Sequence, residues 1–246
     1  MPLSALRDHR SDRPRRRPIV ALGGLGLALA GCAPQAVNEQ GDAVKKLYDF
    51  FSIVAAVIFV IVAGLIAWSI IRYRAKPGDN ELPNQFHSNV KLEVLWFAIP
   101  TLIVIGLFIT SALVLNDINE EAAEPAAVVN VQAFQWGWRF DFEDAGVTLT
   151  SRPGAPAAIS LPVGEPITFV ISSNDVVHSF YIQEFLVKRD AIPGKENRLA
   201  ITINEEGTYD GQCAEFCGLL HSEMPFTINA VPPDEYRTWL EEQPNE

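Results

Sequence analysis

Two long apolar runs without a formal charge constrain this chain most. Residues 50–71 and 94–115 each comprise 22 consecutive uncharged residues, most of them aliphatic or aromatic. About 20 such residues cross the hydrocarbon core of a bilayer as a helix. Arg72, Arg74 and Lys76 directly follow the first run, and basic residues mark cytoplasmic loops. We therefore predict a two-helix transmembrane hairpin whose connecting loop is cytoplasmic and whose flanking segments face outward.

The first 31 residues have the features of a secretory signal peptide. They carry six Arg against two Asp and contain an apolar stretch at residues 19–30. This stretch ends in Leu29-Ala30-Gly31-Cys32, similar to a bacterial lipoprotein cleavage box, in which Cys32 is lipidated and becomes the mature N-terminus. A retained short anchor is the alternative, but the run is shorter than the ~20 residues of a span. The expected division is a signal peptide at 1–31, the hairpin at 32–116 and an external domain at 117–246.

The acidity of the chain is concentrated in residues 117–246. This part contains seven Lys and Arg against 22 Asp and Glu, a formal net charge of −15, while the whole chain has −11. Such a surface attracts basic partners and repels nucleic acid. The charge pattern therefore favours a basic protein partner on the outer side of a membrane and argues against nucleic-acid binding.

After an acidic, Ala-rich linker at residues 117–125, the pattern changes to the alternation typical of β-strands. Apolar and polar side chains alternate in residues 129–133 and again in residues 136–142. The further candidate strands are residues 145–150, 157–161, 166–172, 178–187, 198–204 and 225–231. Short strands at this spacing predict an antiparallel sandwich or barrel. Residues 233–243 predict one short helix, capped by Asp234.

The strongest chemical signal is a segment of twelve residues that begins at Cys213 and ends at Met224. It contains two thiols, Cys213 and Cys217, the imidazole of His221 and the thioether of Met224. Soft sulfur with imidazole suits copper that cycles between Cu(I) and Cu(II). Two Cys four residues apart can bridge two metal ions, and His178 offers a second imidazole. Residues 117–246 contain no other Cys, His or Met, so one copper site accounts for every soft ligand of the domain.

Other structures are compatible with parts of this pattern. A Cys-x-x-x-Cys pair in an exported domain can form a disulfide. A zinc site is weaker, because Met is a poor zinc ligand, and a mononuclear blue-copper site needs only one Cys. A single histidine such as His178 is more often structural than a ligand. The spacing and the scarcity of the soft ligands together favour copper.

Residues 175–180, 190–194 and 211–225, together with the hairpin, resemble cytochrome c oxidase subunit II. The resemblance covers residues 42–239 and implies a cupredoxin-like antiparallel β-barrel with a dinuclear copper A centre. The copper ligands would be His178, Cys213, the backbone carbonyl of Glu215, Cys217, His221 and Met224. The carboxylate of Glu215 would bind a magnesium ion shared with subunit I.

The same resemblance implies a function in electron transfer. The domain would accept electrons from a cytochrome c, either soluble or membrane-bound, and pass them to haem in subunit I. Oxygen would be reduced to water there, coupled to proton translocation, with subunits I and III as the partner subunits. The chain itself has no Cys-x-x-Cys-His haem motif. It would thus be enzymatic only within the assembled oxidase.

The resemblance assigns roles to four more residues. Trp136 matches the residue that admits electrons from cytochrome c, Asp141 and Asp175 match docking acids, and Glu93 matches the glutamate at the start of a proton channel into subunit I. Simpler explanations exist: alternating aromatic residues are most often core, single acids are usually solvated, and the helix dipole favours a carboxylate at a helix N-terminus. The chain also has Gly137 where the family pattern has an aromatic residue, which leaves the extent of the docking face open.

Three other functions share parts of the pattern. A membrane-tethered copper chaperone also carries Cys-x-x-x-Cys, but usually has one span, a thioredoxin-like fold and no Met three residues after a His. A quinol oxidase subunit has the hairpin and barrel without the copper ligands. A copper A nitric oxide reductase stays open, because another polypeptide decides the terminal acceptor. The lipoprotein box and residues 185–190 favour a bacterial cell membrane, in a high-GC Gram-positive lineage.

Overall fold

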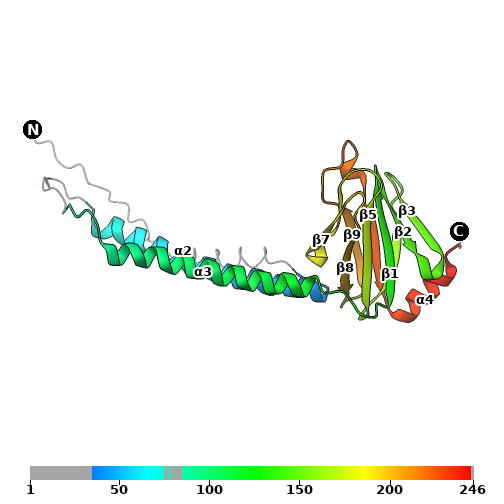
Figure 1. The fold of residues 1–246 in the computed structure, drawn as a ribbon, viewed down its shortest axis with the longest axis horizontal. Coiled ribbons are helices and arrows are strands. Elements are labelled where there is room, and N and C mark those ends of the chain that lie inside the picture. Colours follow the sequence, from blue (N-terminus) through cyan, green and yellow to red (C-terminus); the bar gives the residue numbers. More distant parts are fainter. Residues whose placement is uncertain (1–34, 75–77, 79–84, 245–246) are drawn as a thin grey trace, which may run out of the picture. The chain divides into compact units, whose positions relative to one another are not determined.

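The computed structural model describes residues 35–74, 78 and 85–244 (Figure 1). The predicted signal peptide at 1–31 and the predicted lipidation site at Cys32 lie outside the described residues. Within the described part, two long helices come first, ten strands follow, and a short helix ends the chain. The predicted fold class, a two-helix hairpin followed by a β-domain, is confirmed.

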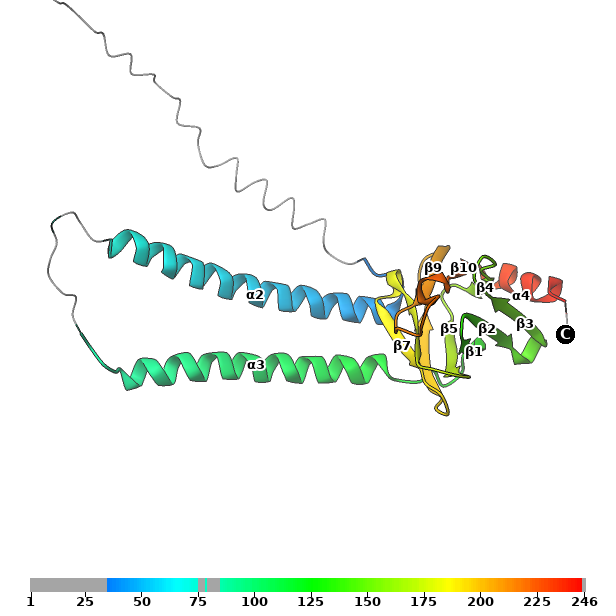
Figure 2. The ribbon, with the colours of Figure 1, turned by 90° about the horizontal axis from the view of Figure 1, so that it is seen from above.

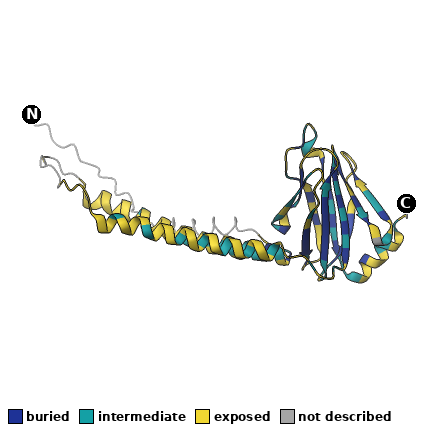
Figure 3. Cartoon of the chain, viewed as in Figure 1, coloured by how far each residue is buried: buried dark blue, intermediate teal, exposed yellow. Residues whose placement is uncertain are grey.

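Helices α2 (Glu39–Arg72) and α3 (Val90–Ile118) contain the two apolar runs and extend beyond them at both ends. They have 34 and 29 residues. At about 1.5 Å rise per residue, each is longer than the ~30 Å core of a bilayer. Most of both helices is exposed (Figure 3), including large apolar side chains such as Phe59 and Leu113. A soluble protein would bury such surfaces, so these helices are suited to a membrane.

Asparagine side chains cap the start of both long helices. Asn38 Oδ1 accepts a hydrogen bond from the backbone N–H of Gly41 at 3.1 Å, and Asn89 Oδ1 accepts one from that of Leu92 at 3.2 Å. The first N–H groups of a helix have no partner within it, and an Asn at this position supplies one. The polar residues before each apolar run therefore determine where its helix begins.

The β-domain consists of two five-stranded sheets, with strand orders β3-β2-β1-β5-β8 and β4-β10-β9-β6-β7. The strands of the first sheet are β3 (Val147–Ser151), β2 (Gly137–Phe142), β1 (Ala127–Phe134), β5 (Pro166–Ser173) and β8 (Asn197–Thr202). Those of the second are β4 (Ala158–Pro162), β10 (Phe226–Val231), β9 (Gly207–Cys213), β6 (His178–Ile182) and β7 (Val187–Ala191). Helix α4 (Pro233–Glu242) contacts β4 (Figure 2).

Two strand pairs are parallel, which differs from the antiparallel sandwich or barrel that the sequence predicts. Asn130 of β1 lies opposite Val170 of β5, and Ile228 of β10 lies opposite Ile159 of β4, both in parallel pairs. Two strands joined by a short turn pair antiparallel, but β2, β3 and β4 separate β1 from β5 along the chain. This long separation allows the parallel arrangement, which local sequence patterns do not reveal.

Aromatic rings form the centre of the core. Trp138 and Phe140 come from β2, Phe180 from β6 and Phe226 from β10, and all four are almost fully excluded from solvent. The rings of Phe180 and Phe226 stack with centroids 4.8 Å apart. Gly211 of β9 lies opposite Phe226, and a Cβ at this glycine would lie 2.0 Å from the ring. The glycine therefore creates the room that the Phe226 ring occupies.

Three local predictions are wrong. The expected strand at 178–187 is two strands, β6 and β7, separated by a 3₁₀ turn at Gln183–Phe185. Strand β9 is absent from the predicted strands, because its Gly and Asp residues resemble a turn. It forms because β10 and β6 pair with it on both sides. Asp234 lies in the first turn of α4 instead of capping it, and the helix follows Pro232.

Candidate metal centre

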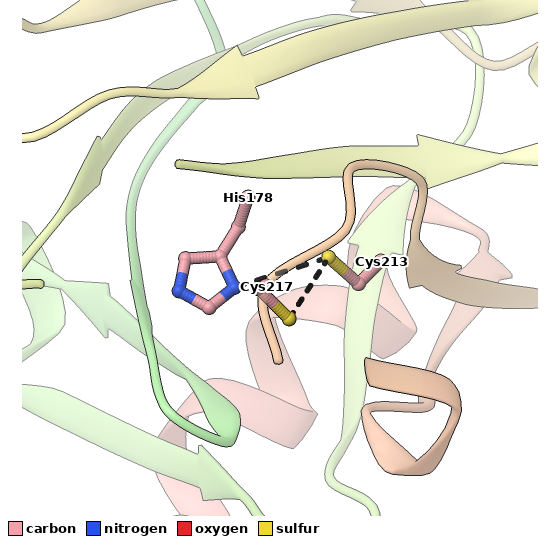
Figure 4. A group of neighbouring side chains, drawn as sticks. All are labelled: His178, Cys213 and Cys217. Atoms are coloured by element: carbon pink, nitrogen blue, oxygen red, sulfur yellow. Dashed lines mark hydrogen bonds between the residues drawn. The ribbon is translucent and has the colours of Figure 1, made fainter. Parts of the chain in front are cut away.

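The predicted copper ligands come from two neighbouring strand ends and one loop. His178 is the first residue of β6, and Cys213 is the last residue of β9. Since these two strands pair antiparallel, both residues lie at the same end of the sheet. The loop between β9 and β10 carries Cys217, His221 and Met224. Figure 4 shows how His178 and the two cysteines converge.

Three of these side chains are close enough to share a metal ion. Cys213 Sγ lies 3.8 Å from His178 Nδ1 and 3.9 Å from Cys217 Sγ (Figure 4). The ligand atoms of all three lie within 4.8 Å of one another. All three residues are buried, His178 completely. A buried cluster of two sulfurs and an imidazole nitrogen fits a soft metal such as copper.

The other three predicted ligands lie around the same two sulfurs. His221 Nδ1 is 3.6 Å and Met224 Sδ is 3.4 Å from Cys217 Sγ. The carbonyl oxygen of Glu215 is 3.2 Å from Cys213 Sγ, while Glu215 as a whole is exposed. The fold thus brings together all six residues predicted to hold copper, with one imidazole beside each sulfur.

Both of these cysteines are free. Their sulfurs are 3.9 Å apart, about twice the ~2.05 Å length of a disulfide bond. Two thiols at this separation, with nitrogen and oxygen donors around them, are arranged for metal ions rather than for a bond to each other. The geometry therefore favours the metal-binding alternative over the disulfide.

The two thiols differ strongly in acidity. Burial raises the pKa of Cys213, but hydrogen bonds with His178 and with the backbone of Glu215 and Ser179 outweigh it and lower the pKa to about 6. Burial and the nearby negative charge of Cys213 raise the pKa of Cys217 to about 12. The pair therefore holds one negative charge readily, and a cation is needed to stabilise the second.

The turn between β1 and β2 closes over the cysteine loop. Gln135 Nε2 donates a hydrogen bond to the carbonyl oxygen of Cys217 at 2.7 Å, and Trp136 Nε1 donates one to the same oxygen at 3.3 Å. Gly218, with a φ of 120°, lies against the indole, and a Cβ there would be 3.2 Å from Trp136 Cζ2. Trp136 is half-buried, so it links the surface to the loop. Sequence patterns give Gln135 no role, because a lone polar residue beside an aromatic one carries no signal.

Gly137 and Trp138 are explained by packing. A Cβ at Gly137 would lie 2.2 Å from the carbonyl oxygen of Ser151 in β3, so an aromatic residue has no room there. Trp138 is fully buried, and its ring packs edge-on against the imidazole of His178 with centroids 6.2 Å apart. Its Nε1 donates a hydrogen bond to the carbonyl of Met224 at 3.0 Å. Trp138 thus forms the inner wall of the site.

Asp175, predicted as a docking acid, contacts the site directly. Its Oδ1 accepts a hydrogen bond from His178 Nε2 at 2.9 Å, and its Oδ2 accepts one from the backbone N–H of Gln135 at 2.6 Å. Burial raises the pKa of Asp175, but hydrogen bonds from His178, Val176 and Gln135 outweigh it and hold the pKa below the ordinary value. The residue therefore presents an ionised carboxylate to the candidate ligand.

Asp141 and Glu93 each have a local structural contact. The carboxylate of Asp141 accepts hydrogen bonds from Arg139 Nε at 2.8 Å and Thr148 Oγ1 at 2.7 Å, so its charge is paired. Glu93 Oε1 accepts a hydrogen bond from the backbone N–H of Asn89 at 3.1 Å. This bond completes a reciprocal cap at the start of α3. Docking and proton uptake stay predictions for these two residues.

The exposed apolar side chains of the two segments that carry the candidate ligands are called the apolar patch. It consists of Phe216 and Leu219, which are 79% and 87% exposed, and of Val176 and Val177, which are 37% and 39% exposed. In the described part of the β-domain, no other large apolar side chain is exposed. Exposed apolar residues that gather in one place mark an interaction surface. The patch lies in the two segments that carry the candidate ligands.

The fold and the site define a β-domain that follows two helices of membrane-spanning length and carries a candidate soft-metal site of sulfur and imidazole. One protein-family model, described as cytochrome c oxidase subunit II, periplasmic domain, matches residues 154–231. A second, described as the transmembrane domain of the same subunit, matches residues 30–114. The chain belongs to the cytochrome c oxidase subunit II family, whose members are subunits of an oxidoreductase complex.

Several proteins are similar along most of the chain. The probable cytochrome c oxidase subunit 2 of Streptomyces coelicolor is 32% identical over 285 residues, covering 96% of this chain and 89% of that protein. Cytochrome c oxidase subunit 2 of Alkalihalophilus pseudofirmus is 32% identical over 229 residues, covering 88% of this chain and 65% of that protein. The crystal structure of the periplasmic domain of subunit II from Bradyrhizobium japonicum has 28% identity and a TM-score of 0.47, covering 50% of this chain and 96% of that chain. The sequence matches give no sign of the copper-chaperone or nitric oxide reductase alternatives.

Proposed function

We propose that this chain accepts single electrons from a cytochrome c at a dinuclear copper A centre and passes them to haem in subunit I. The proposal is carried by one geometric observation: two buried cysteine sulfurs lie 3.9 Å apart, with an imidazole nitrogen beside each. A bound copper pair supplies a one-electron couple that is shared between two ions. Reduction of oxygen to water and the coupled proton translocation take place in subunit I.

In this proposal the two copper ions are held by His178, Cys213, Glu215, Cys217, His221 and Met224. Thiolate and thioether sulfur favour Cu(I), and imidazole nitrogen suits Cu(II) as well, so the donor set fits an ion that alternates between both states. The carbonyl of Glu215 lies beside Cys213 and the thioether of Met224 beside Cys217. Zinc fits this set less well, because a thioether is a poor zinc ligand.

The surroundings keep these ligands in place. Trp138 contacts two of them, His178 through its ring and Met224 through a hydrogen bond to the carbonyl. Gln135 and Trp136 both donate hydrogen bonds to the carbonyl of Cys217. Ligands that are buried and held by their neighbours move little when the charge of the centre changes. Such rigidity favours fast electron transfer.

A basic cytochrome c, soluble or membrane-bound, docks on the apolar patch. The net charge of −15 on residues 117–246 attracts such a partner over long distances. Trp136 is half-buried and donates a hydrogen bond to the carbonyl of Cys217, which supports its role as the residue that admits electrons. Asp141 and Asp175 contribute to the negative field, although both also have internal partners.

Two residues connect the chain to the rest of the oxidase. The carboxylate of Glu215 binds a magnesium ion shared with subunit I. The position of the carbonyl of the same residue beside Cys213 supports this assignment. Glu93 takes part in proton uptake into subunit I, and its cap contact holds the carboxylate at the start of α3. Subunits I and III are the membrane partners of α2 and α3, whose large apolar side chains are exposed.

The chain lies in a bacterial cell membrane with the β-domain on the outer face. Two helices of membrane-spanning length and the basic residues after the first apolar run support this orientation. Residues 1–31 are removed as a signal peptide, and Cys32 is lipidated. The lipoprotein box at Leu29-Ala30-Gly31-Cys32 supports this last step.

Electron paramagnetic resonance of the full chain in detergent, loaded with copper, tests the dinuclear centre. We expect hyperfine lines from two equivalent copper nuclei. The Cys217→Ser variant should lose this pattern, and the control Glu223→Gln, which changes an exposed residue of the same loop, should retain it. A mononuclear spectrum from the unaltered chain, or an unchanged spectrum from Cys217→Ser, would contradict the proposal.

A further inference from the structure

Asp175 uses both carboxylate oxygens to contact different parts of the site. Oδ1 accepts hydrogen bonds from His178 Nε2 at 2.9 Å and from the backbone N–H of Val176 at 2.6 Å. Oδ2 accepts one from the backbone N–H of Gln135 at 2.6 Å. The His178 side chain is 0% exposed and that of Asp175 is 32% exposed. The carboxylate therefore lies between a buried ligand and the turn that precedes β2.

The contact with Asp175 determines how His178 faces the two sulfurs. A carboxylate only accepts hydrogen bonds, so in the neutral imidazole Nε2 carries the hydrogen and Nδ1 keeps a free lone pair. That Nδ1 is the nitrogen 3.8 Å from Cys213 Sγ. Trp138 packs edge-on against the imidazole. A hydrogen bond and an aromatic contact therefore together hold the ring in the orientation that a metal ion requires.

The second oxygen of Asp175 extends this support to the cysteine loop. It holds the backbone N–H of Gln135, whose side chain donates to the carbonyl of Cys217 at 2.7 Å. Trp136, the next residue, donates to the same carbonyl. Hydrogen bonds thus run from His178 through Asp175 and Gln135 to Cys217. They connect three segments that are far apart in the sequence and that all reach the metal centre.

We propose that Asp175 is a positioning residue of the copper centre, which orients His178 and, through Gln135, holds the turn with Trp136 against the cysteine loop. This inference rests on the proposed function and deepens it. A carboxylate bonded to a ligating imidazole orients the ring and makes it a stronger donor. A stronger nitrogen donor stabilises Cu(II) more than Cu(I). Removal of the carboxylate should therefore weaken copper binding and raise the reduction potential.

A docking acid behaves differently from a positioning residue. A docking acid acts through its field on the approaching partner, so its loss slows association at low ionic strength and leaves the metal centre unchanged. A positioning residue changes the metal centre itself, with no cytochrome present. Copper affinity and reduction potential of the isolated chain therefore separate the two roles.

The test uses the full chain in detergent with three variants: Asp175→Ala, Asp175→Asn and the control Glu223→Gln. Glu223 is exposed and lies in the same loop as Met224, so the control removes one negative charge without touching His178. Copper affinity is measured by competition with a chelator, the reduction potential by spectroscopic titration, and folding by circular dichroism. Asp175→Ala should bind copper about 10- to 100-fold more weakly and have a higher potential.

Asp175→Asn should show a smaller change in the same direction. Its amide oxygen can still accept the bond from His178, but its NH₂ group then faces the N–H of Gln135, and the charge is lost. Glu223→Gln should keep the affinity and potential of the unaltered chain. If Asp175→Ala does not fold, the same comparison is made with Asp175→Asn.

Two results would overturn the inference: affinity and potential of the Asp175 variants equal to those of the unaltered chain, or shifts no larger than those of Glu223→Gln. Either result would leave Asp175 as one surface charge among others. Failure of the proposed function looks different, because the unaltered chain itself would then lack the spectrum of two equivalent copper nuclei.

Discussion

The indole Nε1 of Trp136 donates a hydrogen bond to the carbonyl oxygen of Cys217 at 3.3 Å, although 81 residues separate the two in the chain. This bond joins a half-buried aromatic side chain to the backbone of a candidate copper ligand. An aromatic residue in this position can carry an electron from a docked partner to the metal centre. A role in electron transfer can be separated from packing, because the transfer rate and the copper spectrum are measured independently.

Trp136→Phe should slow electron transfer from reduced cytochrome c and leave the copper spectrum unchanged. Phe keeps an aromatic ring but loses the donor to Cys217, which should lower stability by only about 0.5–1.5 kcal/mol. The rate is measured by stopped-flow mixing of the assembled oxidase with cytochrome c. In Trp138→Phe, the control, the carbonyl of Met224 loses a buried partner, so stability and the copper spectrum should change instead. An unaltered transfer rate in Trp136→Phe would remove the role of Trp136.

Copper loading should release fewer protons as the pH rises. The pKa of Cys213 is lowered to about 6 and that of Cys217 is raised to about 12. At about pH 5 both thiols hold a proton that copper displaces, whereas at about pH 8 Cys213 is already ionised and the proton of Cys217 is displaced. Burial lowers the pKa of His178, but hydrogen bonds with Cys213 and Asp175 raise it above the ordinary value. Copper therefore also displaces a proton from His178 at low pH, which adds to the fall in proton release as the pH rises.

Copper is added to the full chain in a weakly buffered solution, and an indicator dye measures the protons released. A release that is independent of pH between these limits would contradict the lowered pKa of Cys213. The Cys217→Ser variant should lose the release that persists at about pH 8.

Glu93→Gln should slow turnover of the assembled oxidase without changing the copper spectrum. The Gln side chain still has an oxygen that can accept the hydrogen bond from the N–H of Asn89, so the start of α3 is preserved. The amide, however, cannot take up and release a proton as the carboxylate does. Glu93→Ala removes the cap contact as well and should cost about 0.3–1.5 kcal/mol of stability. Oxygen consumption gives turnover. If the Gln variant keeps full turnover, Glu93 serves only as a helix cap.

Gly211→Ala should destabilise the β-domain by about 1–3 kcal/mol, because the new methyl group overlaps the ring of Phe226 and the core is already filled. A Cβ at position 211 would lie 2.0 Å from the Phe226 ring. Gly207→Ala is the matched control in the same strand, since its Cβ would meet only the end of the Tyr209 side chain, at 3.2 Å. Thermal unfolding followed by circular dichroism compares the two. Equal melting temperatures would show that the core accommodates the extra methyl group.

Sequence patterns predict the hairpin and most strands because both depend on local chemistry. A run of 22 uncharged residues has few alternatives to a membrane helix, whatever surrounds it. Alternation of apolar and polar side chains in residues 129–133 reflects a strand with one buried face. Strand β9 also alternates, with Tyr209 and Cys213 buried, but Gly207, Asp210 and Gly211 are equally typical of a turn. It exists because two neighbouring strands supply its hydrogen bonds.

For the candidate site, too, the sequence predicts one part and only the structure reveals the other. Five of its six predicted ligands could be named from the residues, because soft donors are scarce in this domain and four of these five lie within one short segment. The sixth, the carbonyl of Glu215, followed only from the resemblance to the family. The contacts around them could not be named. Gln135 carries no motif of its own, and the sequence predicts Asp175 as a docking acid, not as a partner of His178. The exclusion of an aromatic residue at Gly137 depends on the carbonyl of Ser151 in another strand.

The amino-acid sequence alone determined the membrane hairpin, the acidic C-terminal domain and the soft candidate copper ligands, because length, charge and residue scarcity are properties of the chain itself. Only the tertiary structure decided that strands β1 and β5 run parallel, that the two sulfurs remain 3.9 Å apart, and that Asp175 joins His178 to the turn with Trp136. These relationships depend on which distant segments pack together. That choice is made by the free energy of the whole core rather than by any local pattern.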